Sequence, residues 1–421
     1  MHVYKFGGAS VRSAEAIRNV ESILRSQDDT SKPIVISAMG KTTNNLENVV
    51  RLYCKGDDDY KGVLNKIVES HINIARKLLG ESSSELENVL NEHAAKVFDF
   101  CERNQSVHYP FIYDQIVSLG ELMSTRIISY FLNQQGIQNE WVDAREIIRT
   151  DNKYMAAVVD FEMTESLVKK KLPDLLNNKH VITQGFIAGT SERFTTTLAR
   201  EGSDYTAAIL AYCLDAEKMV VWKDVPGILS ADPKLFDNTV KLKELSYLEA
   251  IEMTFYGAKV IHPKTIKPLQ NKGIPMEVRS FMHPAADGTL IKEEGYTANI
   301  PPVVVLKMNQ VLITLMEKDF DFVSQSGLGE IIKTFSKHDI KINMMQNGAI
   351  SFSAVVDYNE RKLQDLIDDL NDLFKITRNE KLELLTIRHF NGKKLEELTH
   401  DKEVLLMQQT RHTVQVLMKE H

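Results

Sequence analysis

Apolar residues follow two alternating patterns along the first two thirds of the chain. Short runs of β-branched and apolar residues predict strands at 33–37, 181–187, 218–222 and 274–279. Apolar residues three or four positions apart predict helices at 13–25, 114–134, 203–214 and 246–256. Strands that alternate with helices are typical of the α/β class. We therefore expect an open, mostly parallel sheet with helices on both faces.

Two stretches interrupt this alternation. Residues 60–104 carry apolar side chains at helical spacing on both sides of Gly80-Glu81-Ser82, which predicts an inserted helical hairpin. Residues 283–299 are polar and contain glycine, which is typical of a linker into another domain. We expect a first domain at 1–297 and a second at 298–421.

The second region has a different order of elements. The pattern predicts a strand at 311–317, a helix at 327–338, strands at 340–345 and 350–356, a helix at 360–373 and a strand at 382–389. The order βαββαβ is that of a ferredoxin-like α+β unit, here spanning about 303–390. The remainder, 391–421, holds two strand-like runs and at most a short helix. It therefore predicts a second, incomplete unit.

Composition places the chain among ordinary globular proteins. Its 421 residues exceed the usual size of one core, and 43% hydrophobic with 26% charged residues is a common balance. A net charge of −7 argues against a nucleic-acid partner. No apolar run reaches membrane-spanning length, and three cysteines without C-x-x-C spacing suggest reduced thiols. We expect a cytoplasmic protein.

The first candidate for chemistry is the heptad Lys-Phe-Gly-Gly-Ala-Ser-Val at 5–11, directly after a strand-like stub. The absent Cβ atoms of Gly7 and Gly8 allow backbone N–H groups to converge on an anion, and a helix start follows. Lys5 adds a cation. Taken alone, a Gly-Gly pair of this kind is more often a tight strand-to-helix turn that carries a surface lysine.

Three other segments carry polar residues beside glycine. Residues 37–46 contain Gly-Lys-Thr, but Val35 stands where a P-loop needs glycine, so a P-loop is excluded. Residues 198–208 place Arg200 before Gly202, and Ser203 or Asp204 can cap a helix of small residues. Residues 222–233 lead from a strand into a Pro-Gly turn, and Lys259 and His262 follow a helix that ends at Gly257.

Taken together, these motifs resemble those of aspartate kinases. The match includes Ser-Leu-Gly-Glu at 118–121, Gln-Gly-Phe-Ile-Ala-Gly at 184–189 and Phe-Tyr-Gly-Ala-Lys-Val-Ile-His-Pro-Lys-Thr at 255–265, in family order over roughly 290 residues. The resemblance implies the amino-acid kinase fold followed by a regulatory region of the ACT type. It also implies transfer of the γ-phosphate of ATP to the side-chain carboxylate of L-aspartate, for lysine, threonine and methionine biosynthesis.

The family's functional positions can be carried over one by one. Lys5, Asp204 and Lys259 match the catalytic positions, and nucleotide contacts fall on Gly7, Gly8, Ser10, Lys223, Asp224 and Lys259. Substrate contacts fall on Ser37, Thr42, Glu121, Arg200 and Ser203. This chain departs from the family at Ala199, Glu201 and Lys223, where glycine, glycine and threonine are common. An acid at 201 raises the question of repulsion between its carboxylate and phosphate.

Cofactor, effector and partner expectations follow from the same resemblance. Mg²⁺ is expected on the ATP phosphates, because no residue cluster has metal-ligand spacing. Asn343, Gln346 and Asn347 stand where lysine-sensing relatives place acids, which favours a neutral effector or none. A homodimer or higher homo-oligomer is expected. The alternatives are another amino-acid or nucleotide kinase of this fold, or a non-catalytic amino-acid sensor.

Overall fold

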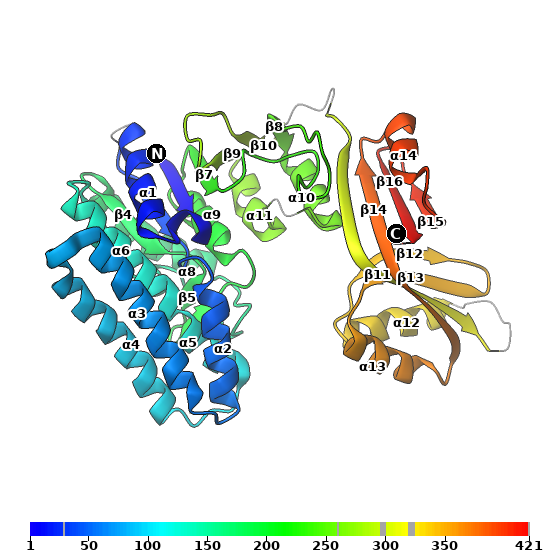
Figure 1. The fold of residues 1–421 in the computed structure, drawn as a ribbon, viewed down its shortest axis with the longest axis horizontal. Coiled ribbons are helices and arrows are strands. Elements are labelled where there is room, and N and C mark those ends of the chain that lie inside the picture. Colours follow the sequence, from blue (N-terminus) through cyan, green and yellow to red (C-terminus); the bar gives the residue numbers. More distant parts are fainter. Residues whose placement is uncertain (28–29, 259–260, 295–299, 319–324, 420–421) are drawn as a thin grey trace. The chain divides into compact units, whose positions relative to one another are not determined.

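The computed structural model describes residues 1–27, 30–258, 261–294, 300–318 and 325–419 (Figure 1). The chain divides into two compact units. Unit one holds residues 1–228, 241–251 and 260–297. Unit two holds residues 229–240, 252–259 and 298–421. In the described ranges, no helix is both long and apolar enough to cross a bilayer.

Unit one is built on an eight-stranded sheet with the order β3-β4-β2-β1-β7-β9-β10-β8. The strands are β1 (His2–Phe6), β2 (Pro33–Ile36), β3 (Asn139–Val142), β4 (His180–Gln184), β7 (Lys218–Lys223), β8 (Glu244–Ser246), β9 (Met276–Ser280) and β10 (Thr289–Lys292). Neighbours pair in parallel except β9 and β10, which pair antiparallel. The predicted mostly parallel sheet is confirmed.

Helices cover this sheet and form the insertion (Figure 1). They are α1 (Ala14–Ser26), α2 (Thr42–Cys54), α3 (Asp59–Leu79), α4 (Ser84–Arg103), α5 (Tyr109–Val117), α6 (Leu119–Gln134), α7 (Ala144–Ile147), α8 (Phe161–Leu176), α9 (Gly202–Cys213), α10 (Tyr247–Tyr256) and α11 (Pro263–Asn271). A short two-stranded sheet joins β5 (Ile187–Gly189) to β6 (Thr195–Thr197). Short 3₁₀ turns precede α1 and α4.

The start of α1 illustrates how the sequence sets local structure. Ser13 caps the helix by accepting a hydrogen bond from the N–H of Ala16 at 3.2 Å. Ile17, Val20 and Ile23 follow at helical spacing and are fully buried against the sheet. At the centre of that sheet the rings of Phe6 and Trp222 stack with centroids 6.0 Å apart. The first helix and the central strands therefore share one core.

Two sequence predictions for unit one need correction. The helix predicted at 114–134 is broken at Ser118 into α5 and α6, and the Ser118 hydroxyl donates to the Gln115 carbonyl at 3.1 Å. Serine competes for backbone groups in this way and favours helix ends. The stretch 283–299, predicted as a linker, contains β10. Its run Thr-Leu-Ile-Lys is too short to stand out among polar neighbours.

Unit two is an antiparallel sheet with the order β12-β13-β11-β14-β16-β15. Its elements are β11 (Val303–Glu317), α12 (Gln325–Lys337), β12 (Ile342–Asn347), β13 (Ser351–Asp357), α13 (Glu360–Leu370), β14 (Phe374–Arg388), α14 (Gly392–Thr399), β15 (Val404–Gln409) and β16 (Thr413–Lys419). The predicted order βαββαβ is confirmed in β11 to β14. Because β14 runs for 15 residues, its last part, Leu382–Arg388, also pairs with β16, and β16 in turn pairs with β15 in the same sheet.

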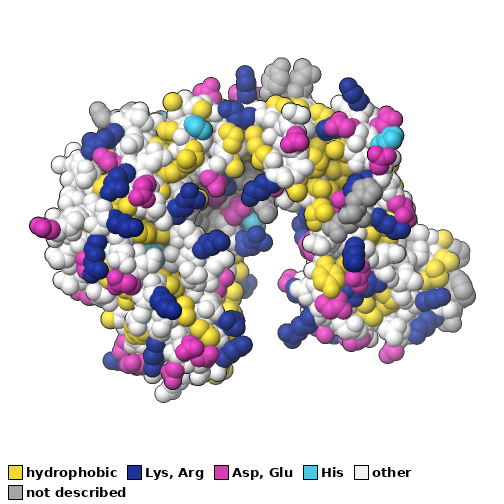
Figure 2. Space-filling model, viewed as in Figure 1, with side chains coloured by type: hydrophobic (Ala, Val, Ile, Leu, Met, Phe, Trp, Pro, Cys, Tyr) yellow, Lys and Arg dark blue, Asp and Glu magenta, His cyan; other side chains and the backbone are white. Residues whose placement is uncertain are grey.

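Charged side chains are mixed over the molecular face shown in Figure 2, where Lys and Arg lie interspersed with Asp and Glu. This distribution agrees with the modest net charge of −7.

Candidate active site

A pocket of about 590 Å³ opens beyond the carboxyl ends of the central strands of unit one. This is the edge at which open α/β sheets bind their ligands. The lining residues come from the end of β1 and the loops after β1 and β2, from α2, α5 and α6, from the segments around Met155 and Phe186, from the turn before α9 and its start, and from the end of β7. They are Lys5, Gly8, Ser37, Ala38, Gly40, Thr43, Glu47, Tyr113, Glu121, Met155, Phe186, Ala199, Arg200, Glu201, Gly202, Ser203, Asp204 and Lys223.

A buried carboxylate holds two lysines at one end of this pocket. Lys5 Nζ lies 2.6 Å from Asp204 Oδ1, and Lys223 Nζ lies 3.4 Å from Asp204 Oδ2. Burial alone would raise the pKa of Asp204, but the charges of Lys5 and Lys223 outweigh it and lower that pKa to about 2. The cluster therefore carries two cations and one anion, and it presents a net positive charge to the pocket.

The Gly-Gly loop after β1 lies close to the loop after β2. A Cβ atom at Gly8 would stand 2.7 Å from the carbonyl oxygen of Ala38. The N–H of Gly40 donates to the carbonyl of Gly8 at 3.0 Å. Glycine is therefore required at position 8 for the approach of two loops, in addition to any access that it gives a phosphate.

Glu121 lines the same pocket from the first turn of α6. Its Oε1 accepts a hydrogen bond from the N–H of Ala38 at 3.3 Å, and its Oε2 has no hydrogen-bond partner among the described residues. Burial raises the pKa of Glu121 to about 8. A buried carboxylate oxygen without a partner at a pocket wall is suited to receive a cationic donor.

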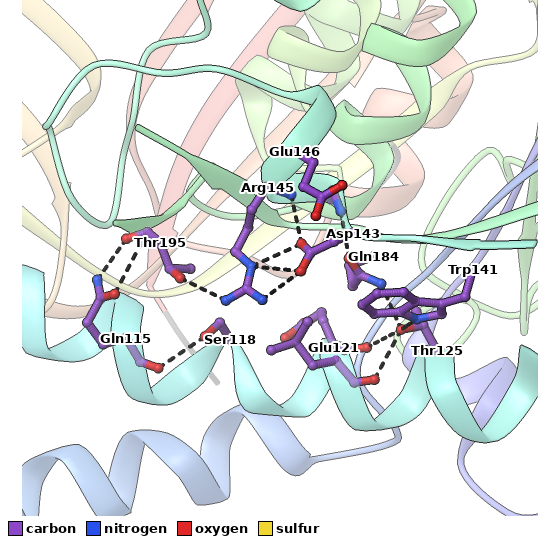
Figure 3. Close-up of polar contacts among 12 residues, drawn as sticks. Gln115, Ser118, Glu121, Thr125, Trp141, Asp143, Arg145, Glu146, Gln184 and Thr195 are labelled. Atoms are coloured by element: carbon purple, nitrogen blue, oxygen red, sulfur yellow. Dashed lines mark hydrogen bonds and ion pairs between the residues drawn. The ribbon is translucent and has the colours of Figure 1, made fainter. Parts of the chain in front are cut away.

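A network of polar side chains holds this part of α6 in place (Figure 3). The Thr125 hydroxyl donates to the Glu121 carbonyl at 2.8 Å and accepts from Trp141 Nε1 and from Gln184 Nε2, each at 2.9 Å. Ser124 Oγ donates to the carbonyl of Ser37 at 2.7 Å. These bonds fix the backbone of the Glu121 turn to β3, to β4 and to the residue directly after β2.

The turn between β6 and α9 has an uncommon backbone. Ala199 has φ +66° and Glu201 has φ +55°, the left-handed region that favours glycine. These are two of the positions at which the sequence departs from the family. Arg200 lies between them and is exposed at the pocket. The Glu201 carboxylate accepts a hydrogen bond from the N–H of His262 at 2.9 Å.

Most residues predicted for the site meet in the pocket, but several lie elsewhere. Ser10 donates its hydroxyl to the Trp222 carbonyl at 3.4 Å, and the Thr42 hydroxyl donates to the Met39 carbonyl at 2.7 Å. Neither Ser10 nor Thr42 belongs to the lining, nor do Gly7 and the exposed Asp224. Lys259 lies outside the described residues.

Sequence reasoning missed several lining residues. Thr43 lines the pocket where Thr42 was predicted, and Glu47 follows one turn later. The Tyr113 hydroxyl donates to Glu47 Oε1 at 2.9 Å, which joins α5 to α2 at the pocket wall. Helical phase could have identified Thr43, because Thr42 lies four residues before the buried Leu46 and shares its face.

A fully buried acid, Asp114, supports the pocket from behind. It accepts hydrogen bonds from the N–H groups of Met155 and Thr197, each at 2.9 Å, and from the Thr197 hydroxyl at 2.7 Å. Burial raises its pKa to about 6. Asp114 therefore joins the Met155 segment to β6, immediately before the Arg200 turn.

Comparison with known proteins identifies the family of this chain. The model of the amino acid kinase family matches residues 1–280. Lysine-sensitive aspartokinase 3 of Escherichia coli (strain K12) is 31% identical over 396 residues, which cover 91% of this chain and 86% of the relative. A bifunctional aspartokinase/homoserine dehydrogenase of Zea mays is 34% identical over 70% of this chain, which spans about a third of that longer protein.

Solved structures agree over the whole chain. E. coli aspartokinase III in complex with lysine and aspartate superposes with a TM-score of 0.82 and 29% sequence identity. The match covers 99% of this chain and 95% of the chain of that enzyme. The same enzyme in complex with aspartate and ADP has a TM-score of 0.82 and 28% sequence identity. That match covers 100% of this chain and 96% of the chain of the enzyme. On this evidence, the chain belongs to the amino acid kinase family and, within it, to the aspartokinases.

Proposed function

We propose that the pocket of unit one transfers the γ-phosphoryl group of ATP to the side-chain carboxylate of L-aspartate, giving 4-phospho-L-aspartate and ADP. The observation that carries this proposal is the presence, in one pocket, of the Lys5–Asp204–Lys223 cluster with Arg200 and Glu121. The cluster is suited to phosphate, and Arg200 and Glu121 are suited to the carboxylate and ammonium groups of an amino acid.

The reaction needs charge neutralisation more than it needs a base. The acceptor carboxylate is ionised at neutral pH and is already nucleophilic. It must approach a γ-phosphate that is itself negative, so catalysis depends on alignment and on cations at the transferring group. Lys5 is placed for this role because Asp204 holds its ammonium group at 2.6 Å. The resemblance to aspartate kinases puts Lys223 beside the ribose and base of the nucleotide, but its ion pair with Asp204 supports a role as a second cation for the same phosphates instead.

Aspartate recognition is assigned to Arg200 and Glu121, which line the same pocket. Arg200 offers two parallel N–H donors to a substrate carboxylate. Glu121 Oε2 accepts from the substrate ammonium group, while Oε1 accepts from the Ala38 N–H and the Thr125 hydroxyl donates to the Glu121 backbone carbonyl. Ser37, Ser203 and Thr43 contribute polar groups to the same lining.

Mg²⁺ is proposed to enter with ATP, as MgATP. In the part of the chain that the structure describes, no cluster of three or more His, Cys, Asp or Glu side chains could hold a metal ion. The phosphate oxygens of ATP are hard ligands that Mg²⁺ prefers. The metal would supply further positive charge at the γ-phosphate. Lys259 stays a proposed partner of the nucleotide phosphates from the family motif.

The proposed domain assignment follows the sequence division, with catalysis at 1–297 and regulation at 298–421. The sheet of unit two ends in β12 and β15, and each edge strand exposes a methionine, Met345 and Met407. Exposed edges of this kind are usually covered by another chain or by charge. We therefore keep the homodimer or higher homo-oligomer as part of the proposal, together with a possible amino-acid effector.

A hydroxamate assay tests the proposed reaction directly. The purified chain is incubated with ATP, Mg²⁺ and a panel of amino acids, and the acyl phosphate is trapped by hydroxylamine. We expect colour with L-aspartate and little with glutamate, asparagine or serine. If glutamate gave as much hydroxamate as aspartate, the proposed selectivity would be refuted. If no amino acid of the panel gave an ATP-dependent hydroxamate, the proposed reaction would be refuted.

A further inference from the structure

The turn that presents Arg200 contains a residue whose backbone is costly for its type. Glu201 adopts φ +55° and ψ +24° directly before α9. Residues other than glycine are disfavoured in this region, because the side chain crowds the backbone. Non-glycine residues that keep such a conformation beside a pocket are candidates for a functional role.

The side chain of Glu201 reaches a distant segment. Its Oε2 accepts a hydrogen bond from the backbone N–H of His262 at 2.9 Å. His262 is the N-cap of α11, and its Nδ1 accepts from the N–H of Lys264 at 3.1 Å. Both partners belong to unit one, and the bond joins the start of α9 to the start of α11. A carboxylate is also favourable near a helix N-terminus.

The same bond fixes where the charge lies. A carboxylate beside Gly202 could repel phosphate, and the backbone donor at His262 holds one of its oxygens at the start of α11 without removing the charge. The carbonyl of Glu201 accepts the N–H groups of Asp204 at 3.0 Å and Tyr205 at 3.2 Å. Glu201 is therefore restrained both through its main chain and through its side chain.

We infer that Glu201 is a positioning residue that fixes the Arg200 turn by anchoring it to the start of α11. Arg200 is exposed and lies between two left-handed residues, so its direction depends on the backbone at 199 and 201. Glycine at 201 would relieve the strain but would add backbone freedom and remove the anchor. The left-handed backbone of Glu201 therefore costs some stability, and its anchor fixes the direction of Arg200. This inference rests on the proposed contact between Arg200 and aspartate.

Two variants at position 201 separate the anchor from the charge of the carboxylate. Glu201→Gly removes both, whereas Glu201→Gln keeps the backbone and an acceptor oxygen but loses the charge. Lys381→Gly is a matched control, because Lys381 has the same φ of +55°, is exposed, and lies in unit two. The measurements are the melting temperature, the hydrogen exchange of the His262 amide, and KM for aspartate and for ATP.

We expect Glu201→Gly to melt no lower than the wild type and to raise KM for aspartate about tenfold, with much less change in KM for ATP. Its His262 amide should exchange faster. Glu201→Gln should keep KM for aspartate within about threefold, since a neutral acceptor still bonds the amide. Lys381→Gly should change neither KM.

Three other outcomes would contradict three different steps of the argument. Unchanged exchange at His262 in Glu201→Gly would show that the anchor is absent in solution. If the His262 amide exchanged faster in Glu201→Gly while both KM values stayed unchanged, the bond between Glu201 and His262 would be a structural contact only. If Arg200→Lys leaves KM for aspartate unchanged while Glu201→Gly slows turnover, then the proposed role of Arg200 fails rather than the anchor.

Discussion

Lys5 Nζ and Asp204 Oδ1 lie 2.6 Å apart between β1 and α9, and both side chains are almost completely buried. Removal of a buried charge from water is costly, so this pair persists only because its partners satisfy each other. The side chains come from positions almost 200 residues apart, and only the packing of α9 on the sheet brings them together. The pair therefore fixes one cation at the pocket in advance of the substrate.

Loss of that cation should abolish most of the activity. Lys5→Ala should lower kcat by on the order of 10² or more, by analogy with the removal of one preorganised charge stabiliser. Steady-state kinetics with saturating aspartate and MgATP measure the change. Lys55→Ala, at an exposed lysine after α2, is the control and should be neutral. Unchanged turnover in Lys5→Ala would remove Lys5 from the mechanism.

Lys223 should act on the nucleotide side of the same cluster. Lys223→Thr leaves Asp204 paired with Lys5, and we expect KM for ATP to rise about tenfold while KM for aspartate changes little, because a phosphate contact is lost. Lys218→Thr changes a lysine of the same strand that pairs with Glu277 outside the pocket. If the two variants behave alike, then Lys223 has no specific part in ATP binding.

Arg200 should discriminate between the two substrates. Lysine cannot reproduce the planar fork of arginine, so Arg200→Lys should raise KM for aspartate much more than KM for ATP. Substrate-saturation curves for each substrate give both values, and Arg51→Lys on the exposed face of α2 provides the comparison. An equal effect on both substrates, or on ATP alone, would assign Arg200 to the phosphates.

The pH dependence should report Glu121. Burial raises its pKa to about 8, so the carboxyl group is protonated below that pH and charged above it. Because the charged form binds an ammonium group, kcat/KM for aspartate should rise with pH through about 8 and level off above it. Glu121→Gln should flatten this rise and lower kcat/KM by about tenfold to a hundredfold.

The same shift predicts an effect on stability. The unfolded chain releases this proton near pH 4.5 and the folded chain near pH 8, so wild-type stability should fall as pH rises through that interval. Denaturant unfolding at several pH values should show Glu121→Gln gaining on the wild type as pH rises. A constant difference would mean that Glu121 is already ionised in the folded protein.

The parts of the site that sequence reasoning found lie close to glycines at the ends of strands and helices. Lys5 lies at the end of β1 before Gly7, and Arg200 and Asp204 flank Gly202 at the start of α9, where local geometry and chemistry coincide. The parts that it missed depend on packing between helices. Glu47 and Tyr113 meet only because α2 and α5 lie side by side, and no local pattern records that contact. The sequence showed that Glu201 stands where glycine is common in the family. Its hydrogen bond with the N–H of His262 depends on tertiary packing and could not be predicted from the sequence.

Unit two shows the same limit. The sequence order βαββαβ follows from hydrophobic periodicity, and the structure has it. The continuation of β11 and β14 into one six-stranded sheet was not predicted, because register shifts at Lys307 and Gln310 disturb the alternation of apolar and polar residues. Strand pairing across such bulges is decided by partner strands rather than by local sequence.

The final prediction concerns regulation and begins with Asn343. Its Oδ1 accepts from Lys307 Nζ at 2.8 Å, and its Nδ2 donates to Gln310 Oε1 at 2.9 Å and to Asp357 Oδ1 at 3.1 Å. The amide is thus satisfied within the sheet, and Lys307 already places an ammonium group beside it. Of the positions predicted to face an effector, Gln346 and Asn347 stay exposed on β12.

We therefore expect lysine to inhibit weakly, because neutral amides give no counter-charge to its side chain and Lys307 would repel it. Activity at sub-saturating aspartate is measured with lysine, threonine or methionine added, and light scattering of the same samples gives the mass. Asn343→Asp should remain insensitive to lysine, since the new carboxylate would pair with Lys307. Strong inhibition of the wild type by lysine alone would contradict this account of β12, and a monomeric mass would contradict the proposed pairing of sheet edges.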